Sequence, residues 1–227
     1  MPACNEEEII EATVREWYEQ VVARIPGAEL IVVDDCSKDR TGEILRALAG
    51  DLPGVHYLCP ERNIGHGMAL LYGLPRSTQA WIFQTDSDRQ HVPADFWPFW
   101  REREGQDFLF GIRGTREDGA SRRLIAAVLR TILLLLWGRW IADANCPFKL
   151  MRRAPLLNVL AAIPADSFIP MVMVSVLART GGFRVAGRTV QHLPRRGGTQ
   201  SLRGVMRWAR VGCQCSLQLL RLRFSGQ

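Results

Sequence analysis

Short apolar and β-branched runs alternate with helical patterns in the first half of the chain. Each run is followed by polar or acidic residues, and the polar stretch 37–39 is typical of a helix start. The pattern predicts a strand over 29–33, a helix over 41–49, a strand over 55–58, a helix over 67–74 and a strand over 80–84. Alternating strands and helices indicate a mostly parallel sheet with helices on both faces.

The second half continues the pattern with longer apolar helices. It predicts strands over 107–111 and 184–192 and helices over 124–137, 168–178 and 201–224. The helix over 124–137 is apolar apart from Arg130, but at roughly 14 residues it is shorter than the about 20 that a bilayer span needs. The last helix alternates arginine with apolar residues, as helices that lie in a lipid headgroup interface do.

We therefore expect an α/β fold and one domain over residues 1–227. A chain of 227 residues matches the size of one globular core. In such sheets ligands bind outside the carboxyl ends of the strands, where the acidic loops of this chain fall.

Composition sharpens this picture through its charge. The chain is 47% hydrophobic and 23% charged, which excludes collagen-like and wholly disordered proteins. The net charge of +6 divides unevenly, because residues 1–100 hold 8 basic and 16 acidic side chains, whereas residues 101–227 hold 21 and 7. Lys38 and Lys149 are the only lysines, so the second half is rich in guanidinium groups that grip phosphate. We therefore expect the acidic first half to bind a cation and the arginine-rich second half to bind an anion.

The six cysteines do not have the spacing of a zinc site. Cys4, Cys36, Cys59, Cys146, Cys213 and Cys215 are scattered, and no signal peptide precedes them. This favours a reduced, cytosolic setting. The basic residues are interleaved with leucine and carry no base-reading motif, so a nucleic-acid partner is disfavoured.

The strongest chemical signal is Asp86-Ser87-Asp88, directly after the predicted strand 80–84. Carboxylates two residues apart on a turn can hold one Mg²⁺ or Mn²⁺ together with a diphosphate. A solvated surface loop is the competing interpretation. Gln90 and His91 follow closely enough to add ligands, and His66 is a further candidate, although a loop histidine is more often a surface residue.

Two other loops carry candidate chemistry. Asp34-Asp35-Cys36-Ser37-Lys38-Asp39 ends a predicted strand and can offer a carboxylate to a nucleobase, or can simply cap the next helix. Asn63-Ile64-Gly65-His66-Gly67 resembles a glycine-rich turn into a helix, where backbone amides attract phosphate.

Taken together, these motifs resemble those of the family 2 glycosyltransferases, particularly the dolichol-phosphate mannose synthase branch. The matching segments begin at Pro2, Asp34, Arg62, Asp86, Gly111, Arg122, Asp143 and His192, and the last runs through Arg195-Arg196-Gly197-Gly198-Thr199-Gln200-Ser201. The resemblance implies a GT-A (Rossmann-like) fold and an inverting, metal-dependent transfer of a sugar from a nucleotide donor to a polyprenyl phosphate.

The resemblance also implies roles for individual residues. Residues 1–100 would form the nucleotide-sugar and metal half, 101–200 the acceptor half and 201–227 a basic amphipathic tail. The implied donor contacts are Pro2, Cys4, Glu6, Asp35, Asp86 and Ser87, and the implied metal ligands are Asp86, Asp88 and Gln90, with Mg²⁺ or Mn²⁺ as cofactor. Arg113 and Arg122 would bind the acceptor phosphate and, with Asp88, act in catalysis, while Arg195, Arg196 and Ser201 belong to the loop that would close on the donor.

Three departures qualify the resemblance. Cys4 stands where the family usually has tyrosine, Cys36 where it usually has glycine, and Ala126 where the mannose synthases have a serine. In addition, Pro2-Ala3-Cys4-Asn5-Glu6 looks like the loop after a strand, yet no strand precedes it. We therefore expect the first strand to be missing, which would cost the flanking strands hydrogen bonds and burial.

A lipid phosphate is already ionised at neutral pH, so this acceptor needs positive charge and no general base. A glycan hydroxyl acceptor would need a base, for which Asp118 and Asp143 are the candidates. A non-catalytic scaffold that binds nucleotide or lipid is a further alternative. The sequence selects neither the sugar, with GDP-mannose and UDP-glucose types both open, nor the oligomeric state. The lipid acceptor implies a peripheral position at the cytoplasmic membrane face.

Overall fold

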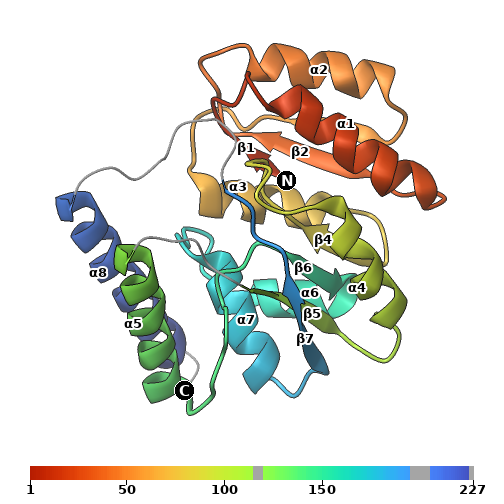
Figure 1. Cartoon of the computed structure of the whole chain (residues 1–227). Coiled ribbons are helices and arrows are strands. Elements are labelled where there is room, and N and C mark those ends of the chain that lie inside the picture. Colours follow the sequence, from red (N-terminus) through yellow and green to blue (C-terminus); the bar gives the residue numbers. More distant parts are fainter. Residues whose placement is uncertain (115–119, 195–204, 225–227) are drawn as a thin grey trace.

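The computed structural model describes residues 1–114, 120–194 and 205–224, without the side chains of 120–125 and 205–213, and arranges them as two sheets with covering helices (Figure 1). The first sheet has the order β1-β2-β3, formed by β1 (Pro2–Ala3), β2 (Leu30–Asp34) and β3 (Val55–Leu58). Both pairings in it are parallel. The predicted parallel pairing is therefore confirmed for these strands, and the element order confirms the alternation of strand and helix.

The second sheet is mixed. Its order is β4-β6-β5-β7, with β4 (Trp81–Gln84), β5 (Phe108–Arg113), β6 (Lys149–Arg152) and β7 (Val185–Val190). Strand β6 runs antiparallel to both neighbours, while β5 and β7 pair in parallel. The sequence did not predict β6, because its letters Lys-Leu-Met-Arg have no alternating or β-branched pattern.

Eight α-helices lie in the described residues, and five of them match predictions. They are α1 (Ile10–Gln20), α2 (Thr41–Asp51), α3 (His66–Gly73), α4 (Phe96–Glu102), α5 (Ala120–Trp137), α6 (Arg153–Ala161), α7 (Pro170–Thr180) and α8 (Val205–Phe224). Short 3₁₀ turns cover Val22–Arg24, Leu74–Arg76 and Pro93–Asp95. Helices α1, α4 and α6 were not predicted.

Helices cover both faces of the first sheet. Ile10 and Val14 of α1 pack with Val32 of β2 and with Leu45 and Leu48 of α2. Helix α3 lies on the opposite face, as Figure 1 shows, so close that a Cβ on Gly73 would meet the Val33 side chain at 2.7 Å. This arrangement directs the loops after β1, β2 and β3 to one edge.

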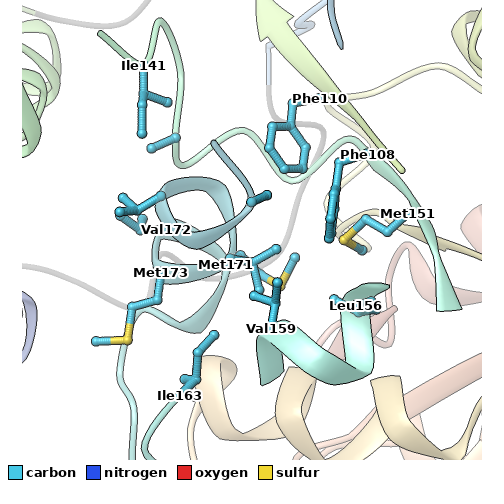
Figure 2. Packing of buried hydrophobic residues seen from close by; sticks show 14 of the residues in the cluster. Phe108, Phe110, Ile141, Met151, Leu156, Val159, Ile163, Met171, Val172 and Met173 are labelled. Atoms are coloured by element: carbon cyan, nitrogen blue, oxygen red, sulfur yellow. The ribbon is translucent and has the colours of Figure 1, made fainter. Parts of the chain in front are cut away.

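A larger core fills the other half of the molecule. Phe108 and Met151 of the second sheet face Leu156 and Val159 of α6 and the buried residues of α7, such as Met171 (Figure 2). A second aromatic cluster, built around Phe148, packs on the other side against α1 and α4. Both cores hold β5 and β6 rigidly, which fixes the positions of Arg113 and Lys149 at the strand ends.

The expectation that the first strand is missing needs correction. Pro2–Ala3 form β1 beside Val33 and Asp34, and the Met1 ammonium donates to the Ile31 carbonyl at 2.9 Å. Burial lowers the pKa of that ammonium to about 6. In the described residues, β2 and β4 are not paired by backbone hydrogen bonds. An apolar cavity of about 330 Å³ lies between them, lined by Met1, Ile31, Val33, Trp81 and Phe83.

Helices α5 and α8 lie side by side, apart from the two sheets (Figure 1). The Arg223 side chain of α8 donates to the Leu136 carbonyl of α5 at 2.9 Å. Among the described residues, neither this pair nor any other helix combines the length and apolar character of a membrane span.

Candidate active site

The candidate site lies where the loops after β1, β2, β3 and β4 meet. The buried Ser87 hydroxyl donates to the Pro2 carbonyl at 2.8 Å and so joins the loop after β4 to β1. Ser87, predicted to contact the donor, thus has a partner inside the protein. Its position keeps Asp86 and Asp88, on either side, at the end of the sheet.

The first two loops are bound to each other by backbone amides. The Asn5 amide donates to the Ser37 hydroxyl at 2.8 Å, and the Glu6 amide donates to the Thr41 hydroxyl at the same distance. In return, the Lys38 amide donates to the Asn5 side chain at 2.7 Å. Asn5 has a φ of 53°, a left-handed conformation that asparagine tolerates better than most residues. The β1 loop therefore has one defined shape.

Asp35 organises the third loop. Its buried carboxylate accepts hydrogen bonds from the Ile64 amide at 2.6 Å and the Gly65 amide at 2.8 Å. The Asn63 side chain donates to the Asp35 carbonyl at 2.7 Å. Cys4 lies in the same place, with its sulfur 3.8 Å from that carbonyl, and burial raises the pKa of its thiol. Pro2, Cys4, Glu6 and Asp35, predicted as donor contacts, are thus brought together.

Asp34 belongs to the segment that the sequence predicted to offer a carboxylate to a nucleobase or to cap a helix, and its carboxylate supports the second loop from within. Its carboxylate accepts from the Ser37 amide at 3.0 Å and the Ser37 hydroxyl at 2.5 Å, and from the Tyr57 hydroxyl at 3.2 Å. The second of two adjacent carboxylates is therefore the one that faces the glycine-rich turn. The sequence shows the acidic pair Asp34-Asp35, but not that Asp34 binds within its own loop while Asp35 binds the glycine-rich turn.

Asp86 and Asp88 lie at the end of β4 beside the start of α3. The His66 imidazole, the first residue of α3, is 3.7 Å from the Asp86 carboxylate. The backbone amide of Gln90 donates to the Asp88 carboxylate at 3.2 Å, and Arg89 between these two residues has a φ of 57°. The two aspartates therefore lie on a tight turn, as the sequence predicted.

The β7 end is bound to this turn. The Gln90 side chain donates to the Leu193 carbonyl at 3.0 Å, while the Leu193 amide donates to the Gln90 carbonyl at 2.8 Å. His91 is buried, packs against Phe148 and lies 5.5 Å from the ring of His192. Burial and then the neighbouring His192 lower the pKa of His91 to about 4, so its ring is neutral at pH 7. His192 is a polar residue at the site that sequence reasoning did not select.

The oxygen ligands of this turn suit a hard divalent cation that also binds water or phosphate oxygens. No group of three or more His, Cys, Asp or Glu side chains in the described residues is arranged to hold a metal by itself. Mg²⁺ and Mn²⁺ accept one or two carboxylates and complete their shell with water and phosphate oxygens. Asp86 and Asp88 fit this chemistry. The side-chain carbonyl oxygen of Gln90 is a third candidate ligand on the same turn.

Arg113 ends β5 in a two-pronged ion pair with Asp143. Its Nε and Nη2 atoms each lie 2.8 Å from an Asp143 oxygen, and the Asp143 side chain is only 4% exposed. This parallel geometry fixes the plane of the guanidinium. Asp143, a candidate general base for a hydroxyl acceptor, instead neutralises an arginine.

Lys149, which was not predicted as a site residue, lies close enough to this ion pair for Asp143 and Arg113 both to act on its pKa. It is fully buried on β6, donates to the Ala144 carbonyl at 3.1 Å and lies 4.8 Å from the centre of the Phe110 ring. Burial lowers the pKa of its ammonium to about 8. The signal in the sequence was a single lysine inside the apolar segment Cys146–Met151, since a charge there needs a reason.

The acidic turn and the arginine end of β5 converge. Asp86 and Arg113 both act electrostatically on His91 and on Lys149, with opposite effects on the pKa of each. The predicted acidic half and arginine half therefore meet at one place, the carboxyl ends of β4 and β5.

Several predicted site residues lie outside the described residues. Arg195, Arg196 and Ser201 fall in 195–204, and Asp118, the other candidate base, falls in 115–119. Arg122 belongs to α5, but its side chain is not described.

Comparisons with known proteins agree with this geometry. The family model described as "Glycosyl transferase family 2" matches residues 1–160. The chain is 29% identical over 189 residues to an undecaprenyl-phosphate 4-deoxy-4-formamido-L-arabinose transferase of Pseudomonas aeruginosa, covering 82% of this chain and 56% of that protein. It is 27% identical to the protein of that name from Yersinia pestis, covering 86% and 59%. The chain thus spans somewhat over half the length of these relatives.

Solved structures support the fold. Glucosyl-3-phosphoglycerate synthase of Mycobacterium tuberculosis, in complex with phosphoglyceric acid, matches with a TM-score of 0.69 and 22% identity over 97% of this chain and 77% of that chain. The same enzyme with Mg²⁺ and uridine diphosphate also matches with a TM-score of 0.69 at 22% identity, covering 97% and 76%. At this identity the likeness establishes a GT-A fold.

Proposed function

The chain belongs to glycosyl transferase family 2, and from this membership we propose that it transfers a sugar from a nucleotide-sugar donor to a polyprenyl phosphate. One observation carries the proposal: the Asp86 carboxylate on the turn after β4 and the oriented Arg113 guanidinium at the end of β5 act on the same two buried side chains, His91 and Lys149. The names of the curated relatives support the acceptor class.

In this proposal the donor lies along the loops after β1 to β4. Pro2, Cys4, Glu6 and Asp35 would contact the nucleotide, with Asp35 also holding the turn at Ile64 and Gly65. Asp86, Ser87, Asp88 and Gln90 would lie at the diphosphate. A bound Mg²⁺ or Mn²⁺, held by Asp86, Asp88 and Gln90, would supply charge neutralisation for the departing nucleoside diphosphate. Uridine nucleotides are the first donors to test, because structures of the same fold contain uridine diphosphate.

The acceptor side is built from arginine. Arg113, fixed in orientation by Asp143, would receive the acceptor phosphate, with Arg122 as a further proposed contact. Arg195, Arg196 and Ser201 would belong to the loop that closes on the donor. An oxygen of the ionised phosphate attacks the anomeric carbon, while the bond from that carbon to the diphosphate oxygen breaks. No proton has to be removed, so the pairing of Asp143 with Arg113 is no obstacle. A glycan hydroxyl acceptor, by contrast, would need a free base.

A lipid acceptor requires access to a membrane surface, and α5 and α8 offer an apolar face for it. Seven of the eight exposed large hydrophobic residues in the described part of the chain lie on or just after these helices: Val128, Leu134, Leu135, Trp140, Leu217, Leu220 and Phe224. Arg130 and Arg221 lie among them. We propose that this helix pair rests on an anionic lipid surface.

The metal assignment can be tested at Asp88. We expect Asp88→Asn to reduce sugar transfer at least about a hundredfold, since it removes an anionic ligand where charge develops. Transfer from a panel of nucleotide sugars to polyprenyl phosphate is measured as label that enters organic solvent. Asp51→Asn, an exposed change at the end of α2, should keep full activity.

Two results would count against the proposal in different ways. Full transfer by Asp88→Asn with an unchanged melting temperature would remove Asp88 from the metal site. If the unaltered chain binds uridine diphosphate and Mn²⁺ in calorimetry but transfers no sugar from any donor, the non-catalytic scaffold is favoured.

A further inference from the structure

Two cysteines outside the proposed chemistry lie in contact at the same edge of the first sheet. Cys36 follows β2, Cys59 follows β3, and their sulfur atoms are 3.9 Å apart. The parallel register that pairs Val33 with Leu58 brings the two strand ends together. Both thiols also approach the Pro60 carbonyl, at 3.1 Å from Cys36 and 3.4 Å from Cys59. The contact thus joins residues 23 positions apart in the chain.

The backbone around Cys36 holds its thiol in this place. Cys36 has a φ of 54°, and its amide donates to the Asp34 carbonyl at 2.8 Å. The next residue, Ser37, is fixed to the Asp34 carboxylate. A non-glycine residue rarely adopts this left-handed conformation unless its surroundings impose it. The loop therefore fixes the position of the Cys36 Cβ, and the sulfur contacts Cys59 and the Pro60 carbonyl from there.

Both thiols are accessible to reagents. Cys59 is exposed and Cys36 is partly exposed, and both line an open cleft of about 550 Å³ with Lys38, Arg46 and Tyr57. Cys146, by comparison, is fully buried. The pKa of Cys36 is raised to about 11, first by exclusion of water and then by its hydrogen bond with Cys59. Reaction through its thiolate should therefore accelerate as the pH rises.

We propose that Cys36 and Cys59 are a modification site at which a disulfide forms and alters the nucleotide loop. The co-reactant is a low-molecular-weight disulfide. One protein thiolate attacks a sulfur of that molecule and releases one small thiol, and the other protein thiolate then displaces the second small thiol. The two cysteines are oxidised, the small disulfide is reduced to two thiols, and the protons of the cysteines pass to the thiols released.

The bond fits the geometry with a small movement. A disulfide has a sulfur–sulfur distance of about 2.05 Å, so the two atoms must approach by roughly 2 Å. Because Cys36 is next to Asp35, we expect the part of this movement that the backbone takes up to displace the loop whose Asp35 carboxylate holds the Ile64 and Gly65 amides. This consequence rests on the proposed function: we expect the oxidised chain to bind uridine diphosphate about tenfold more weakly, since loop displacements of this size misplace ligand contacts.

The pairing is tested on the full chain with oxidised glutathione, followed by peptide mapping without reductant. The expected product links Cys36 to Cys59, is reversed by dithiothreitol and raises the melting temperature by about 5–10 °C. Cys36→Ser and Cys59→Ser should each abolish the linked peptide, whereas Cys4→Ser, the matched change at the neighbouring thiol, should keep it. A link through Cys4, or only glutathione adducts, would overturn the pairing.

Calorimetry separates this proposal from the proposed function. If the linked peptide forms but oxidised and reduced chains bind uridine diphosphate equally, the effect on the nucleotide loop is wrong while the pairing stands. If the reduced chain binds no nucleotide, the proposed function fails, and peptide mapping still decides whether Cys36 and Cys59 pair.

Discussion

At the scale of single residues, the ion pair of Arg113 and Asp143 is the feature most open to a direct test. We predict that Asp143→Asn lowers kcat/KM for the lipid phosphate by roughly 10- to 100-fold, because an amide cannot accept both guanidinium hydrogen bonds. The KM for the donor should change little. Initial rates with each substrate varied in turn measure this difference.

A double variant distinguishes positioning from a general loss of structure. If Asp143 acts by orienting Arg113, then Arg113→Ala combined with Asp143→Asn should lose no more activity than Arg113→Ala alone. Losses that multiply would show that Asp143 has a role independent of Arg113.

Lys149 gives a prediction about pH. Its pKa is lowered to about 8 in the folded protein, against 10.5 for a free lysine, so between these values the unfolded chain binds the additional proton. The free energy of unfolding contributed by Lys149 therefore rises with pH over that window, by about 3 kcal/mol in total. Below pH 8 the cost of burying the charge is present in full.

The matched variant for this effect is Lys149→Met. The Ala144 carbonyl keeps a hydrogen bond from Ser175 at 3.0 Å, so no buried acceptor loses its only partner. We expect the variant to be more stable than the parent at pH 7 and the difference to shrink from pH 8 to 10.5. Urea unfolding at several pH values measures it. A constant difference across this range would contradict the lowered pKa.

Residue types in the sequence predicted which chemistry was present, but partners depend on the folded backbone. Asp86-Ser87-Asp88 was recognisable because its spacing is local. The partner of Ser87, the Pro2 carbonyl, lies 85 positions away, and the pairing of Arg113 with Asp143 spans 30 positions. No local pattern encodes such contacts, so the sequence predicted these side chains as ligand contacts, whereas the structure shows partners within the protein.

At the scale of elements, the crossing of α3 and α7 depends on Gly67. A Cβ at this position would lie 2.5 Å from the Phe168 carbonyl oxygen, a backbone atom that has little freedom to move. We predict that Gly67→Ala lowers the free energy of unfolding by about 1–3 kcal/mol and separates α3 from α7. Urea unfolding of the two proteins measures the change.

Gly50 provides the control for this substitution. It lies in α2, and a Cβ there would meet nothing within 4 Å. Gly50→Ala should therefore stabilise the protein, by about 0.5–1 kcal/mol, because alanine favours the helix. Equal effects at both glycines would contradict the close approach at Gly67.

The local pattern of apolar and polar residues predicted some elements of the fold, but not all of those that it could have indicated. Strand β3 agrees with its predicted bounds, since it is short, apolar and followed by polar residues. Helix α1 was not predicted, although its buried residues Ile10, Val14 and Trp17 have the i, i+4, i+7 spacing of an amphipathic helix among charged residues. Strand β6 was missed because its Lys149 and Arg152 are polar. Its place between β4 and β5 is set by tertiary pairing.

At the scale of the whole molecule, the division of charge along the sequence becomes a division in space. The acidic loops of the first 100 residues lie at the ends of β2 and β4. Arg113, from the basic second half of the chain, lies at the end of β5. Charges of opposite sign that face one site can bring together a cation and two anions. Composition predicted this division, but only the fold places both parts at one edge.

The exposed apolar face of α5 and α8 leads to the last prediction. Leu135 is 79% exposed and Leu217 is 56% exposed, so neither contributes much to the core. We predict that Leu135→Glu combined with Leu217→Glu weakens binding to vesicles containing anionic lipid by at least about tenfold, because each change removes apolar area and adds a repelled charge. Gln79→Glu, an exposed change before β4, should bind almost as the parent does. Flotation at low and high salt measures both effects, since added salt should weaken the contribution of the arginines. A double variant that floats like the parent would show that this helix pair does not rest on lipid.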